Sequence, residues 1–331
     1  MAMIECMRKA VTLEEARQLL LSRSDVLARG VTERGLRTMV DGGSIVRVRR
    51  GWYVDAAEWE QLWVEGRHLL KVLAVHHESI DGGATFCFAS AAVIHGLPLY
   101  RTSPAHVHAV LGPTSRSRVR WGVARHDLTL RARDIVEVEG IRCTSLERTV
   151  LDLACRLTPE AAIAVADAAL RRTAVRGHEQ DDAAAEEWRS ELGRRAQGVS
   201  NRGIRQAREV IALSDGRAQL PGESVSRLHL HRLGFTEVDL QSRVIGPQGE
   251  DYRLDFAFRG ARVFGEFDGW GKYLDPTLRS GMSAEAVVLA EKRREDAIRG
   301  VTGWRIVRWG SEHIVTSDAL GARLRAFGLH P

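Results

Sequence analysis

The sequence predicts an α/β (α+β) protein of several domains. It has 331 residues, of which 44% are apolar, enough for more than one hydrophobic core. Helical periodicity alternates with short period-two strands, and capping residues separate the two. Arginines gather in the first 50 residues and paired carboxylates near the end. We therefore expect a DNA-binding domain over 1–57, a mixed middle domain over 58–175, a helical connector over 176–219 and a last domain over 220–331.

Residues 11–55 have the element order of a winged helix-turn-helix. Thr12 and Glu15 form a capping-box pattern before a first helix, and a short segment follows near 25–28. Thr32 is placed to cap a second helix over 33–40, which Gly42 and the next glycine end. Two strands, 45–50 and 52–55, then flank a turn at Gly51. Helix, turn, helix and hairpin is the order in which such domains present a helix to the major groove.

The charge of this segment favours double-stranded DNA as the partner. Between positions 29 and 50 the chain has six arginines and two acids, a net charge of +4. The second helix would read base edges and the hairpin would contact phosphates. The candidate side chains, on the helix and then on the hairpin, are Arg34, Arg37, Arg47, Arg49 and Arg50. The alternative is a small protein-contact module with a solvated basic face.

The middle of the chain alternates between helices and short strands. We expect a long amphipathic helix over 58–78, a buried strand over 84–89 and a helix over 91–95 capped by Ser90. Short strands are expected at 106–111, 119–125, 134–138 and 141–143. Helices follow at 146–157 and, from Pro159, to about 170. The connector is expected to contain helices over 186–195 and 202–213.

Residues 11–175 resemble the AbiEi-type antitoxins of abortive-infection toxin–antitoxin systems. The segments that carry the resemblance are Val48-Arg-Arg-Gly-Trp-Tyr-Val54, Ser90-Ala-Ala-Val-Ile-His-Gly-Leu97 and Thr144-Ser-Leu-Glu-Arg-Thr-Val-Leu-Asp-Leu153. The resemblance implies an N-terminal winged helix that binds operator DNA and represses its own operon. It also implies a cognate toxin as a partner, which the middle domain neutralises in some members.

Residues 252–272 bring several charged groups into one predicted hairpin. Strands over 252–258 and 263–268 flank a turn, and side chains two apart share a face, so Glu266 and Asp268 point the same way. Pairing of the strands can bring Asp255 close to them. Crowded carboxylates stay ionised only beside a cation, and a divalent ion such as Mg²⁺ or Mn²⁺ held by one or two of them would serve, with Lys272 as the candidate near an attacking water. The alternative is that these acids are solvent-side residues of an exposed hairpin.

Residues 221–329 resemble the nuclease-like domain related to very-short-patch-repair endonucleases, within the PD-(D/E)XK superfamily. The matching segments are Glu223-Ser224, Arg253-Leu-Asp255-Phe, Gly265-Glu-Phe-Asp-Gly269, Lys272-Tyr273, Glu291-Lys-Arg-Arg-Glu-Asp296 and Gly303-Trp-Arg-Ile-Val-Arg308. The resemblance implies a PD-(D/E)XK-like mixed sheet of four or five strands flanked by helices. It implies Asp255 and Glu266 as metal ligands, with Glu223 supporting the metal or its water.

One position departs from the superfamily pattern. The common Glu-x-Lys reads Glu266-Phe-Asp268 here, so a catalytic lysine has to be Lys272 or Lys292. If the catalytic lysine is Lys292, Arg294 on the same helix would clamp a phosphate.

Two functions remain open at this stage. The first is a Mg²⁺-dependent DNA endonuclease that a winged helix brings to the duplex. The second is an antitoxin-like transcriptional regulator whose C-terminal domain only binds, which a neighbouring gene for a nucleotidyltransferase-like toxin would favour. No Gly-rich phosphate loop, Ser-His-Asp set or dinucleotide fingerprint is present. No signal peptide or apolar run of ~20 residues occurs, so we expect a cytoplasmic protein with no membrane partner.

Overall fold

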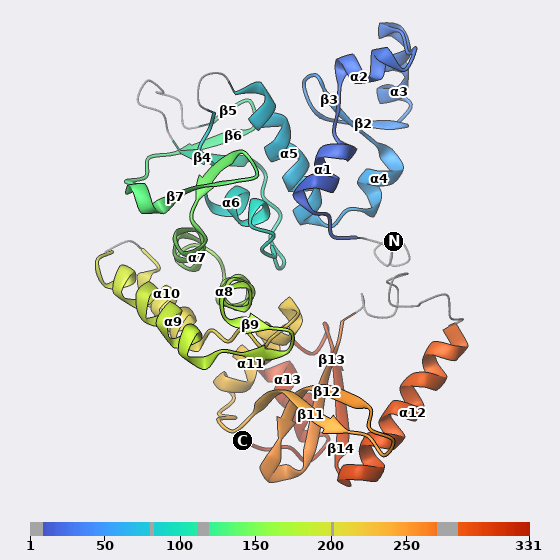
Figure 1. Cartoon of the computed structure of the whole chain (residues 1–331), viewed down its shortest axis with the longest axis vertical. Coiled ribbons are helices and arrows are strands. Elements are labelled where there is room, and N and C mark those ends of the chain that lie inside the picture. The colour runs from blue at the N-terminus through green and yellow to red at the C-terminus, as the bar shows by residue number, and fades with distance from the viewer. Residues whose placement is uncertain (1–8, 80–82, 111–118, 200–201, 270–283) are drawn as a thin grey trace. The chain divides into compact units, whose positions relative to one another are not determined.

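The structure, a computed structural model, describes residues 9–79, 83–110, 119–199, 202–269 and 284–331 (Figure 1). The chain divides after Arg156 into two compact units, called unit 1 (up to residue 156) and unit 2 (157–331). Both combine helices with small sheets, which confirms the expected α+β class. None of the described helices has the length and apolar content that a membrane span requires.

Short helices and a three-stranded sheet form the first part of unit 1. The elements are α1 (Leu13–Leu19), β1 (Leu21–Ser22), α2 (Arg23–Ala28), α3 (Glu33–Asp41), β2 (Ile45–Arg49) and β3 (Trp52–Asp55). Strand β3 lies between β1 and β2 and is antiparallel to both. The predicted capping box is confirmed, since Thr12 Oγ accepts from the Glu15 N–H (3.2 Å) and the Glu15 carboxylate accepts from the Thr12 N–H (2.7 Å). The Thr32 hydroxyl caps α3 as expected.

A small core fixes α3 against the sheet. Val26 of α2, Leu36 of α3, Ile45 of β2 and Tyr53 of β3 form one buried cluster. Because Leu36 faces inward, the opposite side of α3 faces solvent. Gly51 has φ of 78°, the left-handed conformation that the turn between β2 and β3 requires.

The prediction of a single helix over 58–78 is wrong. Two helices, α4 (Ala56–Gln61) and α5 (Val64–Glu78), are separated at the extended residue Leu62. The backbone of Lys9 pairs with this break: the Lys9 N–H donates to Gln61 O (2.6 Å) and the Trp63 N–H donates to Lys9 O (3.2 Å). Leu62 is fully buried there. Pairing with Lys9 therefore ends the helix, and periodicity within 58–78 carries no trace of it.

The rest of unit 1 is built around two small sheets. Its elements are α6 (Phe88–Ile94), β4 (Val107–Val110), β5 (Val119–Arg120), β6 (Val123–His126), the 3₁₀ turn η2 (Ala132–Asp134), β7 (Ile135–Val138), β8 (Ile141–Thr144) and α7 (Leu146–Ala154). The expected strand at 84–89 is reduced to Phe86, which bridges β4 and β8. Helix α6 already begins at Phe88, so the prediction that Ser90 caps it is wrong. The Ser90 hydroxyl instead accepts from the His108 N–H (2.8 Å).

Unit 2 begins with a group of helices. They are α8 (Pro159–Ala174), α9 (Asp182–Gln197), α10 (Ile204–Leu213) and α11 (Pro221–Arg232), with the two-residue strands β9 (Val175–Arg176) and β10 (Glu179–Gln180) between α8 and α9. Fully buried Asp167 of α8 accepts two hydrogen bonds from Arg227 Nη2 of α11, at 2.8 and 2.9 Å. This ion pair joins α8, the first helix of the group, to α11, the last.

A mixed four-stranded sheet follows in unit 2. Its order is β11 (Asp239–Ile245), β12 (Asp251–Phe258), β13 (Val263–Asp268) and β14 (Arg305–Gly310), antiparallel except for the parallel pair β13 and β14. The predicted hairpin and its turn, η3 (Arg259–Ala261), are confirmed. Helix α12 (Ala284–Thr302) precedes β14, and α13 (Ser317–Arg325) follows it.

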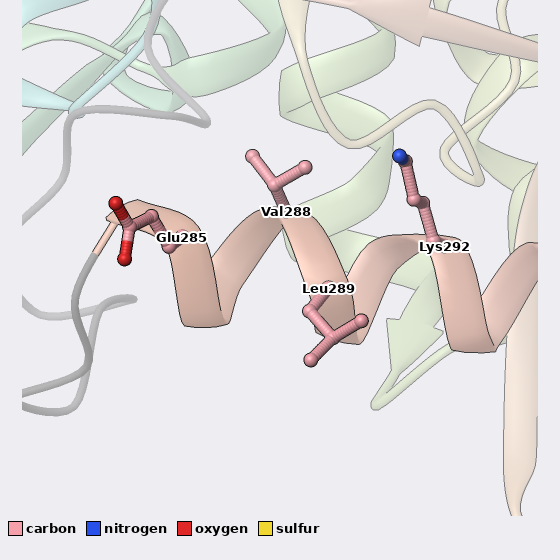
Figure 2. A pocket seen from close by; sticks show the side chains of 4 residues that line it. All are labelled: Glu285, Val288, Leu289 and Lys292. Atoms are coloured by element: carbon pink, nitrogen blue, oxygen red, sulfur yellow. The ribbon is translucent and has the colours of Figure 1, made fainter.

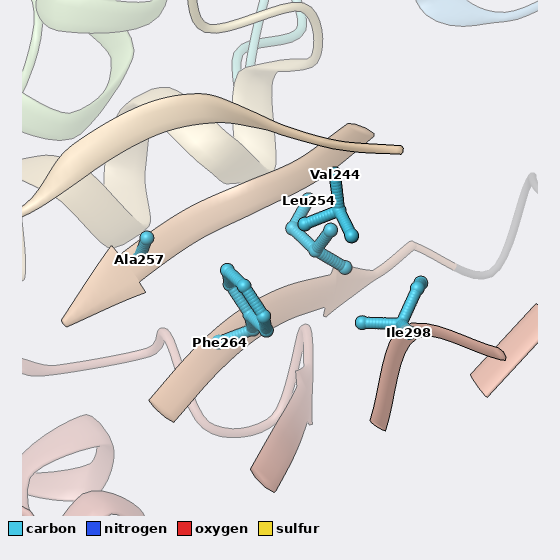
Figure 3. Packing of buried hydrophobic residues seen from close by; sticks show 5 residues of the cluster. All are labelled: Val244, Leu254, Ala257, Phe264 and Ile298. Carbon is cyan, nitrogen blue, oxygen red and sulfur yellow. The ribbon is translucent and has the colours of Figure 1, made fainter. Parts of the chain in front are cut away.

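Helices cover both faces of this sheet. On one face Ile298 of α12 packs with Val244, Leu254, Ala257 and Phe264 (Figure 3). Because strand side chains alternate, Glu266 shares the face of Phe264, toward α12.

On the opposite face the Trp309 ring donates to Ser226 Oγ of α11 (2.9 Å). Gly222 brings α11 close to β13, since a Cβ there would lie 2.0 Å from the Phe267 ring.

Candidate functional site

Four arginines of unit 1 form an exposed basic surface. Arg34 and Arg37 lie on α3, and Arg47 and Arg50 lie at the β2–β3 hairpin. All four are exposed, and none is ion-paired with a residue that the structure describes. Such side chains keep their charge available to an anionic partner. We call these four residues the basic surface.

Arg49 is held differently from its neighbours. Its Nε donates to Glu78 Oε2 of α5 (2.5 Å), its Nη1 donates to Trp121 O (2.6 Å), and its side chain is 17% exposed. Trp52, the first residue of β3, stacks on His77 of α5 with ring centroids 4.7 Å apart. Arg49 thus fastens the hairpin to the rest of unit 1, whereas Arg47 and Arg50 form no ion pair with a residue that the structure describes.

The predicted carboxylates of unit 2 do come together. Asp255 of β12 lies beside the Glu266 strand, because Asp255 Oδ2 accepts from the Phe267 N–H (2.9 Å). Both carboxylates are buried, with 8% and 7% of each residue exposed. Asp268 lies on the same side as Glu266, since Arg308 contacts both of them. The exposed-hairpin alternative is therefore wrong for Asp255 and Glu266.

Gln241 joins the helical acid to this group. Its amide Nε2 donates to Glu223 Oε2 (3.3 Å) and to Asp255 Oδ1 (3.5 Å), and its Oε1 accepts from the Gln219 side chain (3.0 Å). Glu223 Oε2 also accepts from the Gln219 N–H (2.8 Å). Gln241 has φ of 51°, a left-handed conformation inside strand β11 that costs a non-glycine residue about 1–3 kcal/mol.

Two arginines occupy the oxygens of Glu266. Arg294 Nη2 of α12 lies 2.7 Å from Oε1, and Arg308 Nη2 of β14 lies 2.9 Å from Oε2. Arg308 also pairs with Glu291 of α12 and approaches Asp268 Oδ1 (3.5 Å). Burial raises the pKa of Glu266, and the charges of the two guanidiniums oppose that rise. Although burial acts against it, the pKa of Arg308 is well above its usual value because of Glu266 and Glu291.

Of the two lysines expected at this site, the structure describes one. Lys272 lies outside the described residues. Lys292 is exposed on α12, where with Glu285, Val288 and Leu289 it lines a shallow pocket (Figure 2). Arg294, expected as a phosphate clamp, donates instead to Glu266, to Glu291 Oε1 (3.0 Å) and to the Arg253 carbonyl (2.8 Å).

The arrangement does not fit a divalent metal. Among the residues that the structure describes, no three His, Cys, Asp or Glu side chains form a group that could hold a metal ion. Both Glu266 oxygens are bonded to guanidiniums, and both Asp255 oxygens accept N–H groups. Mg²⁺ takes oxygen ligands in near-octahedral geometry, usually one or two carboxylates together with waters, so it requires carboxylate oxygens that no cation already occupies. Mg²⁺ or Mn²⁺ at Asp255 and Glu266 stays a prediction of the sequence that this donor set does not favour.

Arg308 and Gln241 of this network were not predicted as site residues. Arg308 belongs to a strand that the sequence does predict, but its place beside Glu266 depends on the parallel register that pairs the two residues. Gln241 carries no recognisable signal, because one glutamine in a strand is common.

Comparison with known proteins gives matches over much of the chain. Residues 84–199 match the family model of the AbiEi antitoxin C-terminal domain. The chain is 31% identical over 277 residues to the uncharacterized protein MT2308 of Mycobacterium tuberculosis (strain CDC 1551 / Oshkosh), an alignment that covers 84% of this chain and 89% of the relative. The same values hold for the uncharacterized protein Rv2248 of Mycobacterium tuberculosis (strain ATCC 25618 / H37Rv).

Proposed function

The chain belongs to the same family as the Mycobacterium tuberculosis proteins MT2308 and Rv2248, and we propose that it is an antitoxin-type protein that binds double-stranded DNA. The match of residues 84–199 to an AbiEi antitoxin domain supports the antitoxin class. The observation that carries DNA binding is the basic surface of Arg34, Arg37, Arg47 and Arg50, exposed on one helix and the adjacent hairpin.

A winged helix-turn-helix role for this part is supported by its element order. Helices α1, α2 and α3 precede the antiparallel hairpin β2–β3, and β1 adds a short third strand. In such domains the last helix enters the major groove and the hairpin lies along the backbone. Arg34 and Arg37 would then meet base edges, and Arg47 and Arg50 would meet phosphates.

The C-terminal sheet is part of this proposal as a non-cleaving domain. Hydrolysis of a phosphodiester by the expected route requires a metal that activates water and neutralises charge on the phosphoryl oxygens. Arg294 and Arg308 hold the oxygens of Glu266 that such a metal would need. The rival function, a Mg²⁺-dependent DNA endonuclease, is supported by the resemblance of residues 221–329 to PD-(D/E)XK nuclease-like domains and by the gathering of Glu223, Asp255 and Glu266.

Salt-dependent DNA binding tests the proposal. Each phosphate contact contributes about 0.9 to the slope of log K against log salt concentration. Replacing Arg47 and Arg50 together with alanine should therefore flatten the slope by up to ~1.8 for any duplex, as measured by fluorescence anisotropy with the full chain.

Two variants serve as controls for that measurement. The double substitution Arg243→Ala and Arg299→Ala removes the same charge from exposed positions of unit 2 and should leave the slope unchanged. Arg49→Ala should flatten the slope less than the Arg47 and Arg50 variant does, because the Arg49 charge is already paired with Glu78. An unchanged slope in the Arg47 and Arg50 variant would overturn the assignment of DNA to this surface.

A cognate toxin is the second partner that we propose. Its support is the AbiEi antitoxin match alone. Co-expression of this chain with the product of a neighbouring nucleotidyltransferase-like gene should restore growth that the toxin alone stops. Growth arrest that persists at full expression of this chain would remove the antitoxin part of the proposal.

A further inference from the structure

We propose that internal donors take the place of a divalent metal in the carboxylate cluster of unit 2, so that this cluster fastens helix α12 to the sheet and binds no Mg²⁺ or Mn²⁺. The donors are the side-chain amide of Gln241 and the guanidiniums of Arg294 and Arg308. The amide donates to Glu223 and Asp255, which is the first position, and the two guanidiniums pair with Glu266, which is the second.

The first position is filled by Gln241. Its Nε2 lies within 3.5 Å of an oxygen of Glu223 and of Asp255, where it donates one N–H to each. A cation shared by these acids would need the same position. The left-handed φ of Gln241 shows that the surrounding structure holds this residue in an unfavourable conformation. Its oxygen in turn accepts from Gln219 Nε2 (3.0 Å).

The second position is filled by two guanidiniums. Arg294 and Arg308 approach different oxygens of Glu266, at 2.7 and 2.9 Å, and each side chain is 22% exposed. A guanidinium carries its positive charge permanently, whereas a metal must be taken from solution. The carboxylate that a magnesium ion would neutralise is therefore already neutralised by the chain itself.

The consequence of this network is mechanical. Glu291 and Arg294 belong to α12, whereas Glu266 and Arg308 belong to adjacent strands of the sheet. Glu291 Oε1 accepts from both Arg294 and Arg308. Arg294 also donates to the Arg253 carbonyl of β12 (2.8 Å). One turn of α12 is thus joined to three strands by charged hydrogen bonds, about one turn from the apolar anchor Ile298.

This inference concerns unit 2 alone and does not require DNA binding by unit 1. Thermal unfolding of the full chain, without DNA, with added Mg²⁺ or Mn²⁺ tests it directly. A metal held by the folded protein with a Kd of about 1 mM would, at 10 mM, raise the ratio of folded to unfolded protein about elevenfold. We expect no rise in Tm for the parent protein with either ion beyond that seen with the same ionic strength of Na⁺.

Two arginine variants test the fastening role. Arg308→Met should lower Tm and speed hydrogen exchange in peptides from α12, because three carboxylates lose a partner. Arg299→Met, a substitution within α12 itself, is the matched control. Arg299 is 52% exposed and, among the described residues, pairs only along the surface of α12. If Arg308→Met fails to fold, Arg308→Lys keeps the charge and loses only the multiple contacts.

The outcomes separate clearly. Absence of metal stabilisation, together with faster α12 exchange in the Arg308 variant than in the Arg299 variant, supports the proposal. Stabilisation of the parent by Mg²⁺ or Mn²⁺ that Glu266→Gln abolishes would overturn it. Equal α12 exchange in the two arginine variants would overturn the fastening role.

Discussion

Removing Arg227 should destabilise unit 2 more than any surface change, because it leaves Asp167 without its counter-charge. Asp167 is fully buried, and Arg227 Nη2 contacts both of its oxygens, at 2.8 and 2.9 Å. Burial raises the pKa of Asp167, and the charge of Arg227 and the Asp215 N–H oppose that rise. Breaking a buried pair on one side costs about 3–5 kcal/mol.

The variant Arg227→Met should therefore lower the free energy of opening of α8 and α11 by about 3–5 kcal/mol. Native-state hydrogen exchange of peptides from these helices measures that energy, since a multi-domain chain has no single unfolding free energy. The double variant Arg227→Met with Asp167→Asn removes both charges and should recover part of the loss. A double-mutant cycle in which the two effects add within about 0.5 kcal/mol would refute the pairing argument.

Three further outcomes are expected. Gly222→Ala should destabilise unit 2 by about 1–3 kcal/mol, because the added Cβ would overlap the Phe267 ring. Gly193→Ala, in open space on α9, should stabilise unit 2 by about 0.5–1 kcal/mol. Urea unfolding compares the two variants, and equal effects would contradict the packing. Burial and the charge of His108 lower the pKa of His68 to about 3, so below pH 6.5 the unfolded chain binds a proton at His68 that the folded chain does not bind. Stability should thus fall as pH drops below 6.5, by about 2 kcal/mol from pH 7 to pH 5, and His68→Gln should lack that part of the loss in denaturation at both pH values. Arg37→Ala should relax base preference at one position by about 1–3 kcal/mol in a selection from random duplexes, and an unchanged preference would remove Arg37 from base contact.

Much of the secondary structure could be predicted because its signals are local. Thr12 with Glu15, Thr32 and Pro159 each mark a helix start within three residues of themselves, and the structure confirms all three starts. Strand alternation likewise predicted the β12–β13 hairpin and the shared side of Glu266 and Asp268. These features depend on neighbours in the sequence.

The errors arise where distant residues decide. The break at Leu62 depends on pairing with Lys9, and the position of Ser90 inside α6 depends on a hydrogen bond with His108. Glu266 was expected to face a metal, but whether it meets a metal or Arg308 depends on the register of a parallel strand some 40 residues later. Spacing within one segment cannot supply that register.

We propose that this chain binds duplex DNA without cutting it, and one assay measures both properties. Supercoiled plasmid is incubated with the parent protein in Mg²⁺ or Mn²⁺, beside Glu266→Ala prepared identically, and each sample is divided for binding and for cleavage. We expect a plasmid band that is shifted by bound protein but remains supercoiled, with the parent and with Glu266→Ala alike. Nicking or linearisation by the parent that Glu266→Ala abolishes would contradict it and establish the endonuclease instead.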